Sequence, residues 1–325
     1  MAQLHPQEIY LLEYFTSLEH FCNVRDAMRE AVRLGEQCLD EFMHHLPADL
    51  RRRHTSEQPD VVWGGLVLPN LRSSLDGLIE GCILRSHNDP QAYRGLVGTY
   101  GGNINKNIGE FDASWMPEPL GTAFWDALDK AIALDKIVGY TIGGSWQAGD
   151  LTWSCNFDDP NDVLGGTDVR LPTRIPAYEL DHSVVITPGD QVKECGVYLP
   201  DAENTAAQFL HPGRWWQEEP GIWVRQGLVK DEYGWWAEAQ DVYPSRWTLV
   251  RRVPGQFIEV PQEGFYPKQI LDSSRTEAGQ PCPQAGWWWS PAKEGSRRAF
   301  QAGEVMPDFP ESSYGSTIWY REIEQ

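Results

Sequence analysis

The chain has 325 residues and a formal net charge of −20 at pH 7, from 27 lysines and arginines against 47 aspartates and glutamates. Hydrophobic residues make up 41% of the chain and charged residues 23%, which excludes an intrinsically disordered polymer and is enough for a buried core. A chain of this length exceeds the size at which one hydrophobic core usually stops growing, so two or three domains are expected.

The negative charge is spread along the chain and is not confined to an acidic tail. Residues 1–135, 136–260 and 261–325 carry net charges of −9, −8 and −3. Such a field repels nucleic acid and anionic membranes and attracts basic proteins. The simpler alternative is that the acidity serves only solubility.

Targeting segments and catalytic motifs are both absent from the sequence. The N-terminal MAQLHPQEIYLLEYF lacks the basic start and the apolar run of a signal peptide, and no stretch approaches the roughly 20 apolar residues of a membrane span. The six cysteines form no C-x-x-C and no zinc-type cluster with histidine, so we expect reduced thiols in a cytoplasmic protein. No nucleotide-binding, metalloprotease or nucleophile-elbow motif occurs. These observations predict a binding protein without cofactor, metal or catalytic residues, and not an enzyme.

Residues 1–136 are expected to form a helical domain. Apolar residues recur at spacings of three and four from Pro6 to Leu46, with Pro47 as a stop. Arg25 and Gly35 interrupt this pattern, which predicts a bend or two helices. A second helix is expected from Asn70, a plausible N-cap, to Ile83, and a third from about Pro119 to Leu134. Residues 101–107 are expected to form a loop, and the helices are long enough for a bundle of three or four.

Strand-like runs begin near Ile137, bounded by turn residues. The runs are Val138–Ile142, Leu151–Phe157, Ser183–Thr187, Ile222–Val229, Trp235–Ala239, Thr248–Val253 and Gln256–Val260. The expected fold class is α+β: a helical bundle at residues 1–136, followed by two related, Trp-rich, barrel-like β modules at residues 137–260 and 261–325.

An internal repeat suggests that the two β modules are related. Residues 196–209 (GVYLPDAENTAAQF) resemble residues 286–300 (GWWWSPAKEGSRRAF). Gly196 matches Gly286, and after a one-residue insertion the matches lie at an offset of 91. Those matches are Pro200 with Pro291, Glu203 with Glu294, and Phe209 with Phe300. We expect one module used twice, and chance similarity between Pro- and Trp-rich strands is the alternative.

Fifteen tryptophans, most of them from Trp146 onward, fit three interpretations. They could fill the cores of small barrels, anchor a protein interface, or stack on sugar rings. The segment 215–220 places two tryptophans beside two glutamates at an expected turn. Residues 158–162 are expected to form an acidic loop, which lacks the glutamate of an EF-hand. The predicted partner-binding residues are Asp158, Asp159, Asp162, Trp215, Trp216, Glu218 and Glu219.

The C-terminal run GQPCPQAGWWWSPAKEGSRRAFQAGEVMP, followed by YGSTIWYREI, resembles a module of bacterial polymorphic-toxin immunity proteins. It is similar to the immunity families numbered seventy-one and seventy-two over about 45 residues. The resembling residues are Gly279, Cys282–Pro283, Gly286–Trp287, Pro291, Arg298–Phe300, Gly303–Glu304, Met306–Pro307 and Trp319. The first copy of the repeat departs from this pattern, since His211–Pro212–Gly213 stands where the module has GEVMP.

The resemblance implies an antitoxin that binds a cognate secreted toxin, often one delivered by the type VI secretion system, and protects the producing cell. Many such toxins are nucleases, whose basic surfaces would attract a protein of net charge −20. The partner expected is therefore a toxin with a basic surface, with no direct nucleic acid or membrane contact, and homo-oligomers are possible. Two alternatives remain open, a carbohydrate-binding or carbohydrate-processing protein, and an effector chaperone or adaptor.

Overall fold

The structure, a computed structural model, divides into two compact units, Met1–Phe265 and Tyr266–Gln325. It describes residues 3–94, 108–159, 162–202, 205–212, 221–230, 236–266, 275–290, 292–293, 295–310 and 317–321. In the first unit the helices are α1 (Pro6–Phe15), α2 (Leu18–His44), α3 (Pro59–Val62), α4 (Leu68–Ser86) and α6 (Leu120–Gly143). Shorter helical turns lie at Leu50–Arg52, Thr55–Glu57, Trp63–Val67 and Pro90–Tyr93.

The strands form three antiparallel sheets. In the first unit these are β1 (Arg174–Ile186), β2 (Gly196–Pro200), β3 (Gln208–Leu210), β4 (Gly221–Lys230), β5 (Trp236–Pro244) and β6 (Trp247–Glu259). In the second unit they are β7 (Arg275–Glu277), β8 (Gly286–Trp289), β9 (Arg298–Phe300) and β10 (Ile318–Arg321). The α+β class is therefore confirmed, but the sheets of the described residues are open and the predicted barrel-like closure is not observed.

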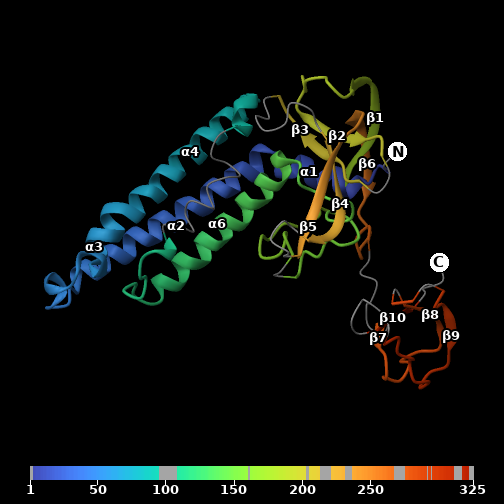
Figure 1. Cartoon of the computed structure of the whole chain (residues 1–325). Coiled ribbons are helices and arrows are strands. Elements are labelled where there is room, and N and C mark those ends of the chain that lie inside the picture. Colours follow the sequence, from blue (N-terminus) through green and yellow to red (C-terminus); the bar gives the residue numbers. More distant parts are fainter. Residues whose placement is uncertain are drawn as a thin grey trace. The chain divides into compact units, whose positions relative to one another are not determined.

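The three long helices lie side by side, with α2 between α4 and α6 (Figure 1). Gly35 lies where all three meet, because a Cβ there would come within 2.8 Å of Leu68 and 3.1 Å of Phe124. Its missing side chain lets the three helices approach closely. The sequence pattern predicted a bend or a break at this glycine, but α2 continues through it from Leu18 to His44. No helix in the described part of the chain is long and apolar enough to cross a membrane.

The break in the first helical segment lies earlier than Arg25. Helix α1 ends at Phe15, and the Ser17 hydroxyl accepts a hydrogen bond from the His20 backbone N–H at 3.1 Å, which caps the start of α2. The segment therefore forms two helices, one of the two arrangements expected, and the cap residue determines where they separate. Asn70 is not a cap, because α4 already begins at Leu68.

Helix α6 continues past the predicted end of the helical domain at residue 136. Ile137, Val138 and Ile142 are buried and extend the helical stripe until Gly144, whose left-handed backbone (φ 59°) ends the helix. The predicted strand Val138–Ile142 was wrong, because its β-branched residues follow helical spacing. The predicted strand Leu151–Phe157 is also wrong, since these residues form consecutive turns. The predicted loop at 101–107 lies outside the described residues.

The two four-stranded sheets share one topology. The first has the order β1-β6-β2-β3 and the second the order β7-β10-β8-β9. We call them the first module and the second module. Gly196 pairs with Leu210 as Gly286 pairs with Phe300. Ile186 pairs with Trp247 as Thr276 pairs with Trp319. The hairpin β4–β5 lies between β3 and β6 of the first module and has no counterpart in the order of the second.

The register corrects the repeat alignment inferred from the sequence. Equivalent residues of β2 and β8, and of β3 and β9, differ by 90 with no insertion, so Phe300 corresponds to Leu210 and not to Phe209. Sequence comparison matched identical residue types, whereas register follows the backbone ladder and the alternation of buried side chains. Of the other predicted matches, Pro291, Glu203 and Glu294 lie outside the described residues.

Side chains repeat the correspondence between the modules. Tyr198 and Trp288 are both fully buried. Each side chain donates a hydrogen bond to the backbone carbonyl oxygen four residues earlier, at Glu194 (2.9 Å) and Gln284 (3.0 Å). Leu210, Trp247 and Leu249 build the core of the first module with Tyr198, and Phe300, Trp319, Cys282 and Met306 build the core of the second with Trp288. Several residues that carry the immunity-protein resemblance are thus core residues of the second module.

Both modules require a glycine at the start of the hairpin that forms one side of the sheet, β2–β3 in the first module and β8–β9 in the second. A Cβ at Gly196 would lie 2.7 Å from Leu249 Cδ1, and one at Gly286 would lie 3.1 Å from the equivalent Arg321 side chain, where φ is also 151°. We expect Gly196→Ala to lower the free energy of unfolding by about 1–3 kcal/mol, because the new methyl group overpacks the sheet. Chemical denaturation measures this.

The matched control is Gly65→Ala in the helical region, where a Cβ would meet nothing within 4 Å. This variant should be as stable as the wild type or more stable, since alanine favours helix. Equal stability of the Gly196→Ala protein and the wild type would show that the close approach of Leu249 is not a constraint.

Candidate functional site

The described residues of the predicted acidic loop, Asp158, Asp159 and Asp162, lie near one another among hydrogen-bonded turns. The Asp162 carboxylate accepts the backbone N–H groups of Asn156 (3.1 Å) and Leu164 (2.9 Å), so it organises the loop. Asp158 is exposed and lies 3.5 Å from Arg170, and Asp159 is half-buried. The structure brings these three residues together, but only Asp158 is fully presented at the surface. No group of residues able to hold a metal ion is found in the described part of the chain.

The other predicted partner-binding residues, Trp215, Trp216, Glu218 and Glu219, lie outside the described residues. Exposed tryptophans elsewhere were not singled out by the sequence. Trp153 is 60% exposed, and in the second module Trp287 and Trp289 are 42% and 43% exposed on either side of the buried Trp288. Strand alternation is the signal that could have separated Trp287 and Trp289 from Trp288.

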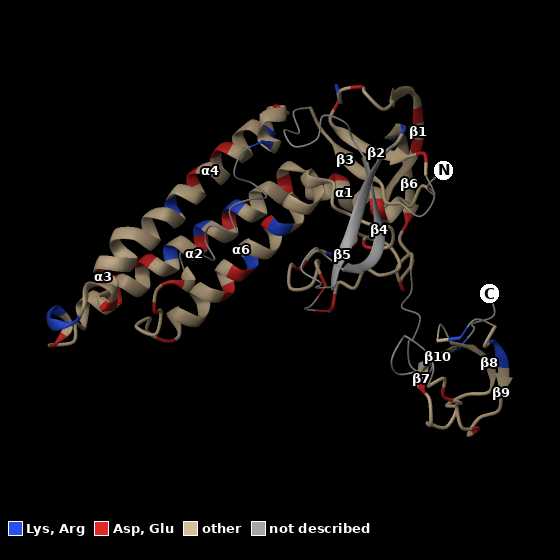
Figure 2. Ribbon diagram, viewed as in Figure 1, with Lys and Arg blue, Asp and Glu red and all other residues tan. Residues whose placement is uncertain are grey.

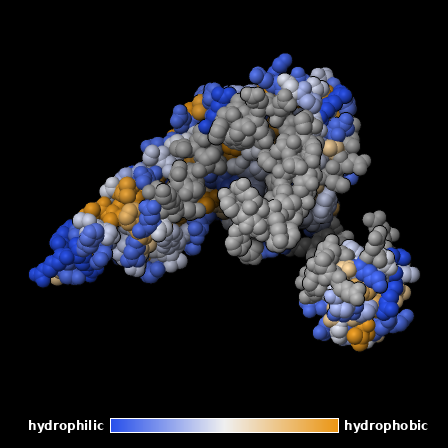
Figure 3. Space-filling view, viewed as in Figure 1, coloured by the Kyte–Doolittle hydropathy of each residue, from blue (hydrophilic) through white to orange (hydrophobic). Residues whose placement is uncertain are grey.

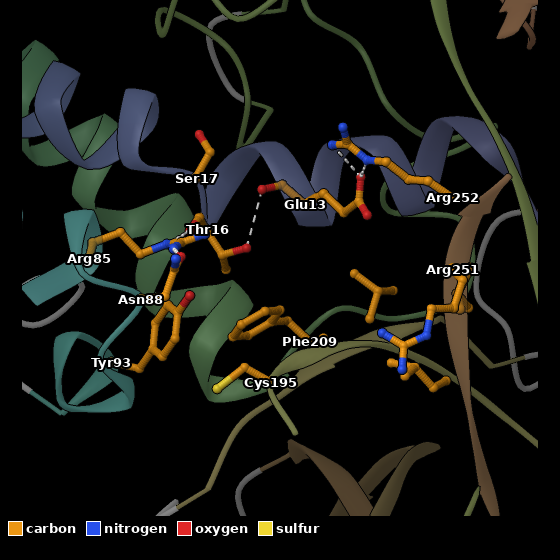
Figure 4. A pocket seen from close by; sticks show the side chains of 14 residues that line it. Glu13, Thr16, Ser17, Arg85, Asn88, Tyr93, Cys195, Phe209, Arg251 and Arg252 are labelled. Carbon is orange, nitrogen blue, oxygen red and sulfur yellow. Dashed lines mark hydrogen bonds and ion pairs between the residues drawn. The ribbon is translucent and has the colours of Figure 1, made fainter. Parts of the chain in front are cut away.

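A cavity of about 440 Å³ lies in the first unit between the α1–α2 corner, the end of α4 and the first module. Figure 4 shows Arg85, Tyr93 and Cys195 at one side and Arg251 and Arg252 at the other. The sequence did not single out these residues, because they come from three distant segments and form no motif.

The arginines of this cavity are engaged by neighbouring groups. Arg85 donates from Nε to the Thr16 carbonyl at 2.7 Å and from Nη1 to Asn88 at 2.7 Å. Arg252 forms an ion pair with Glu13 of α1 at 2.7 Å, and its pKa is raised chiefly by that hydrogen bond. Because these contacts join α4 to the α1–α2 corner and β6 to α1, they favour a structural role for the groups that line the cavity.

The thiol and the phenol that line the cavity are held neutral. Burial raises the pKa of the Cys195 thiol to about 11 and that of the Tyr93 hydroxyl to about 12. A thiol with this pKa is almost entirely protonated at neutral pH and is therefore a weak nucleophile. Elsewhere in the first unit, His20 is fully buried, and burial lowers its pKa to about 4.

A buried polar cluster joins α1 to the first module. Glu8, 2% exposed, accepts the Ala207 backbone N–H at 3.1 Å, and Gln7 donates to the Leu151 carbonyl at 2.8 Å. From the strand side, Gln208 of β3 donates to the Trp146 carbonyl at 2.6 Å. Burial, with a smaller contribution from the charge of Asp150, raises the pKa of Glu8 from 4.5 to about 8. Glu8 is therefore neutral in the folded protein at pH 7.

Comparison of the chain with protein families, with curated proteins and with solved structures found no match.

The buried Glu8 makes stability depend on pH. Its folded pKa is raised, so the stability of the neutral form is fully present below pH 4.5 and is lost as the pH rises through about 8. We expect Glu8→Gln, which keeps the shape and stays neutral, to raise the free energy of unfolding at pH 8 by roughly 4 kcal/mol. At pH 4 the variant should match the wild type, and denaturation series at both pH values measure the difference.

The exposed Glu19→Gln change serves as the control and should keep the wild-type pH dependence, because it leaves the cluster intact. A Glu8→Gln protein with the same stability loss between pH 5 and 8 as the wild type would refute the assignment.

Proposed function

We propose that this chain binds a cognate antibacterial toxin with a basic surface, a nuclease being the expected class, and neutralises it by covering its active cleft. The proposal combines the net charge of −20 with the resemblance of residues 279–325 to immunity proteins. In this proposal the protein acts in the cytoplasm of the producing cell and needs no catalytic group of its own.

The observation that carries the proposal is the excess of surface carboxylates over cations. Many arginines and lysines are already paired within the chain, as Arg33 is with Glu30, Arg72 with Glu36, and Lys130 with Asp168. The two charges of each such pair cancel locally, so the carboxylates that remain outnumber the remaining cations. Figure 2 shows acidic residues along α2 and α6, and Asp126 and Asp129 are exposed on α6. A long rigid bundle with this charge supports fast, salt-sensitive attraction to a basic protein.

A second surface feature fits protein binding as well. Met43, Leu46, Val61 and Leu66 are each 37–45% exposed near the end of the bundle, and Figure 3 shows hydrophobic residues gathered over α3. Apolar area beside charged surface is typical of protein interfaces.

The carbohydrate-binding alternative is favoured by one observation, the two exposed tryptophans of β8. Trp side chains on a sheet face can stack on sugar rings as well as on protein. A glycan array distinguishes the two functions, since a sugar-binding protein retains a glycan and a toxin inhibitor does not. The chaperone or adaptor alternative is distinguished by the activity of the purified complex, which a chaperone leaves intact.

Co-expression tests the proposal directly. The product of the adjacent gene, expressed alone in a bacterial host, should stop growth, and expression of this chain beside it should restore growth. If the neighbouring product is harmless alone, or kills equally when this chain is present, the proposed function is wrong.

Association kinetics test the role of charge separately. The reversal Asp126→Lys/Asp129→Lys should slow association with the toxin several-fold, roughly in line with the loss of electrostatic steering, and the effect should fade at high salt. Lys136→Glu on the same helix adds acid and should speed association. An association rate that responds to neither variant would exclude steering by α6.

A further inference from the structure

One face of the first module is covered by helices. Val197 and Leu199 of β2 are each 3% exposed and belong to the large core that includes α1 and α6. The opposite face of the same strands, with Tyr198 and Leu210, forms the separate core of the module itself. A four-stranded sheet thus uses one face for its own core and the other for the helices.

The helix that covers this face brings carboxyl groups to the sheet. Glu8 of α1 accepts the backbone N–H of Ala207, beside β3. Glu13 of α1 pairs with Arg252 of β6 and accepts a hydrogen bond from the Tyr178 hydroxyl of β1 at 3.0 Å. The covering element is therefore an apolar helix whose acidic side chains meet donors of the sheet.

The equivalent face of the second module carries exposed aromatic residues. The shared register places Trp287 at the position of Val197 and Trp289 at that of Leu199. Both are more than 40% exposed in the described structure, whereas Trp288 between them is fully buried in the module core. The second module has thus kept its core and carries larger apolar side chains on the face that helices cover in the first.

Neighbouring side chains hold these tryptophans in place. The Trp289 ring stacks on Tyr320 of β10, with centroids 5.4 Å apart and an interplanar angle of 30°. The Arg297 guanidinium lies 4.2 Å from the centroid of the Trp287 ring. We call Trp287, Trp289, Tyr320 and Arg297 the aromatic face. It is an ordered apolar platform with a cation at one edge.

We propose that the aromatic face binds an apolar helix of a partner protein. The first module shows that this sheet architecture receives such a helix, since α1 packs on the equivalent face. Trp287 and Trp289 are the anchor residues, since exposed Trp beside Arg is typical of interface hot spots. In the cell the helix would belong to the toxin, and this last point alone rests on the proposed function.

A peptide with the sequence of α1 and its flanking residues tests the inference without the toxin. The probe carries residues 3–18 of this chain, bridged between positions 10 and 14 so that it stays helical, because helices this short are marginal in water. Titrated into the full-length chain and followed by calorimetry, it should bind with one-to-one stoichiometry. Trp287→Ala/Trp289→Ala should weaken binding at least about tenfold. Val305→Ala, which removes another exposed apolar side chain (62%) of the same unit, should not.

Absence of binding by the peptide, or equal binding by wild type and Trp287→Ala/Trp289→Ala, would overturn the proposal.

Three other occupants have distinct outcomes, each of which would overturn the proposal. A sugar platform would bind a cello- or chito-hexaose through Trp287 and Trp289 while ignoring the peptide. A second copy of the chain would make the protein a dimer by light scattering that Trp287→Ala/Trp289→Ala converts to a monomer. Coverage by the chain's own first unit would block the peptide and make the double variant less stable to heat.

Discussion

A small antiparallel sheet has two faces, and its own connecting segments can cover only one of them. This constraint is visible in the first module, where Tyr198, Leu210 and Trp247 form an internal core while Val197 and Leu199 turn toward the helices. The helices and the sheet are therefore parts of one folded unit, and the boundary expected near residue 136 falls inside α6. The buried Glu8 and the Glu13–Arg252 ion pair lie at the same junction, which places polar contacts within an otherwise apolar interface.

The second module meets the same constraint differently. Its core repeats that of the first, with Trp288, Phe300 and Trp319 at the positions of Tyr198, Leu210 and Trp247, but its other face presents Trp287 and Trp289. Helices cover this face in the first module, and the same face of the second module carries two exposed tryptophans. This difference supports a binding role for the second module. Together with the net charge of −20, this gives a two-part account of recognition, in which charge brings a basic partner near and the aromatic face contributes contact area.

The sequence predicted the parts of the fold that follow local rules. Helical spacing located the long helices, and the Gly196 and Gly286 hairpins were recognised as a repeat. Prediction failed where tertiary contacts decide the outcome. Val138–Ile142 has strand-forming residues but continues helix α6. The repeat was aligned one residue out of register, because Phe209 was matched to the identical residue type at Phe300, whereas strand pairing matches Leu210 to Phe300. Glu8, Arg85 and Arg252 form no motif, so the junction they build could not be seen. Asp158, Asp159 and Asp162 were predicted as part of one acidic loop, and the sequence did not show that the Asp162 carboxylate accepts two backbone N–H groups of that region.

We expect the aromatic face to be open in the free protein and to be covered when the partner binds. Fluorine NMR of the chain labelled with 5-fluorotryptophan tests this, with the signals assigned through single Trp→Phe variants. Trp287 and Trp289 should respond to a soluble paramagnetic agent in the free protein, Trp288 and Trp319 should not, and the toxin should protect the first pair. Protection of Trp287 and Trp289 already in the free chain, or their continued exposure in the complex, would contradict it.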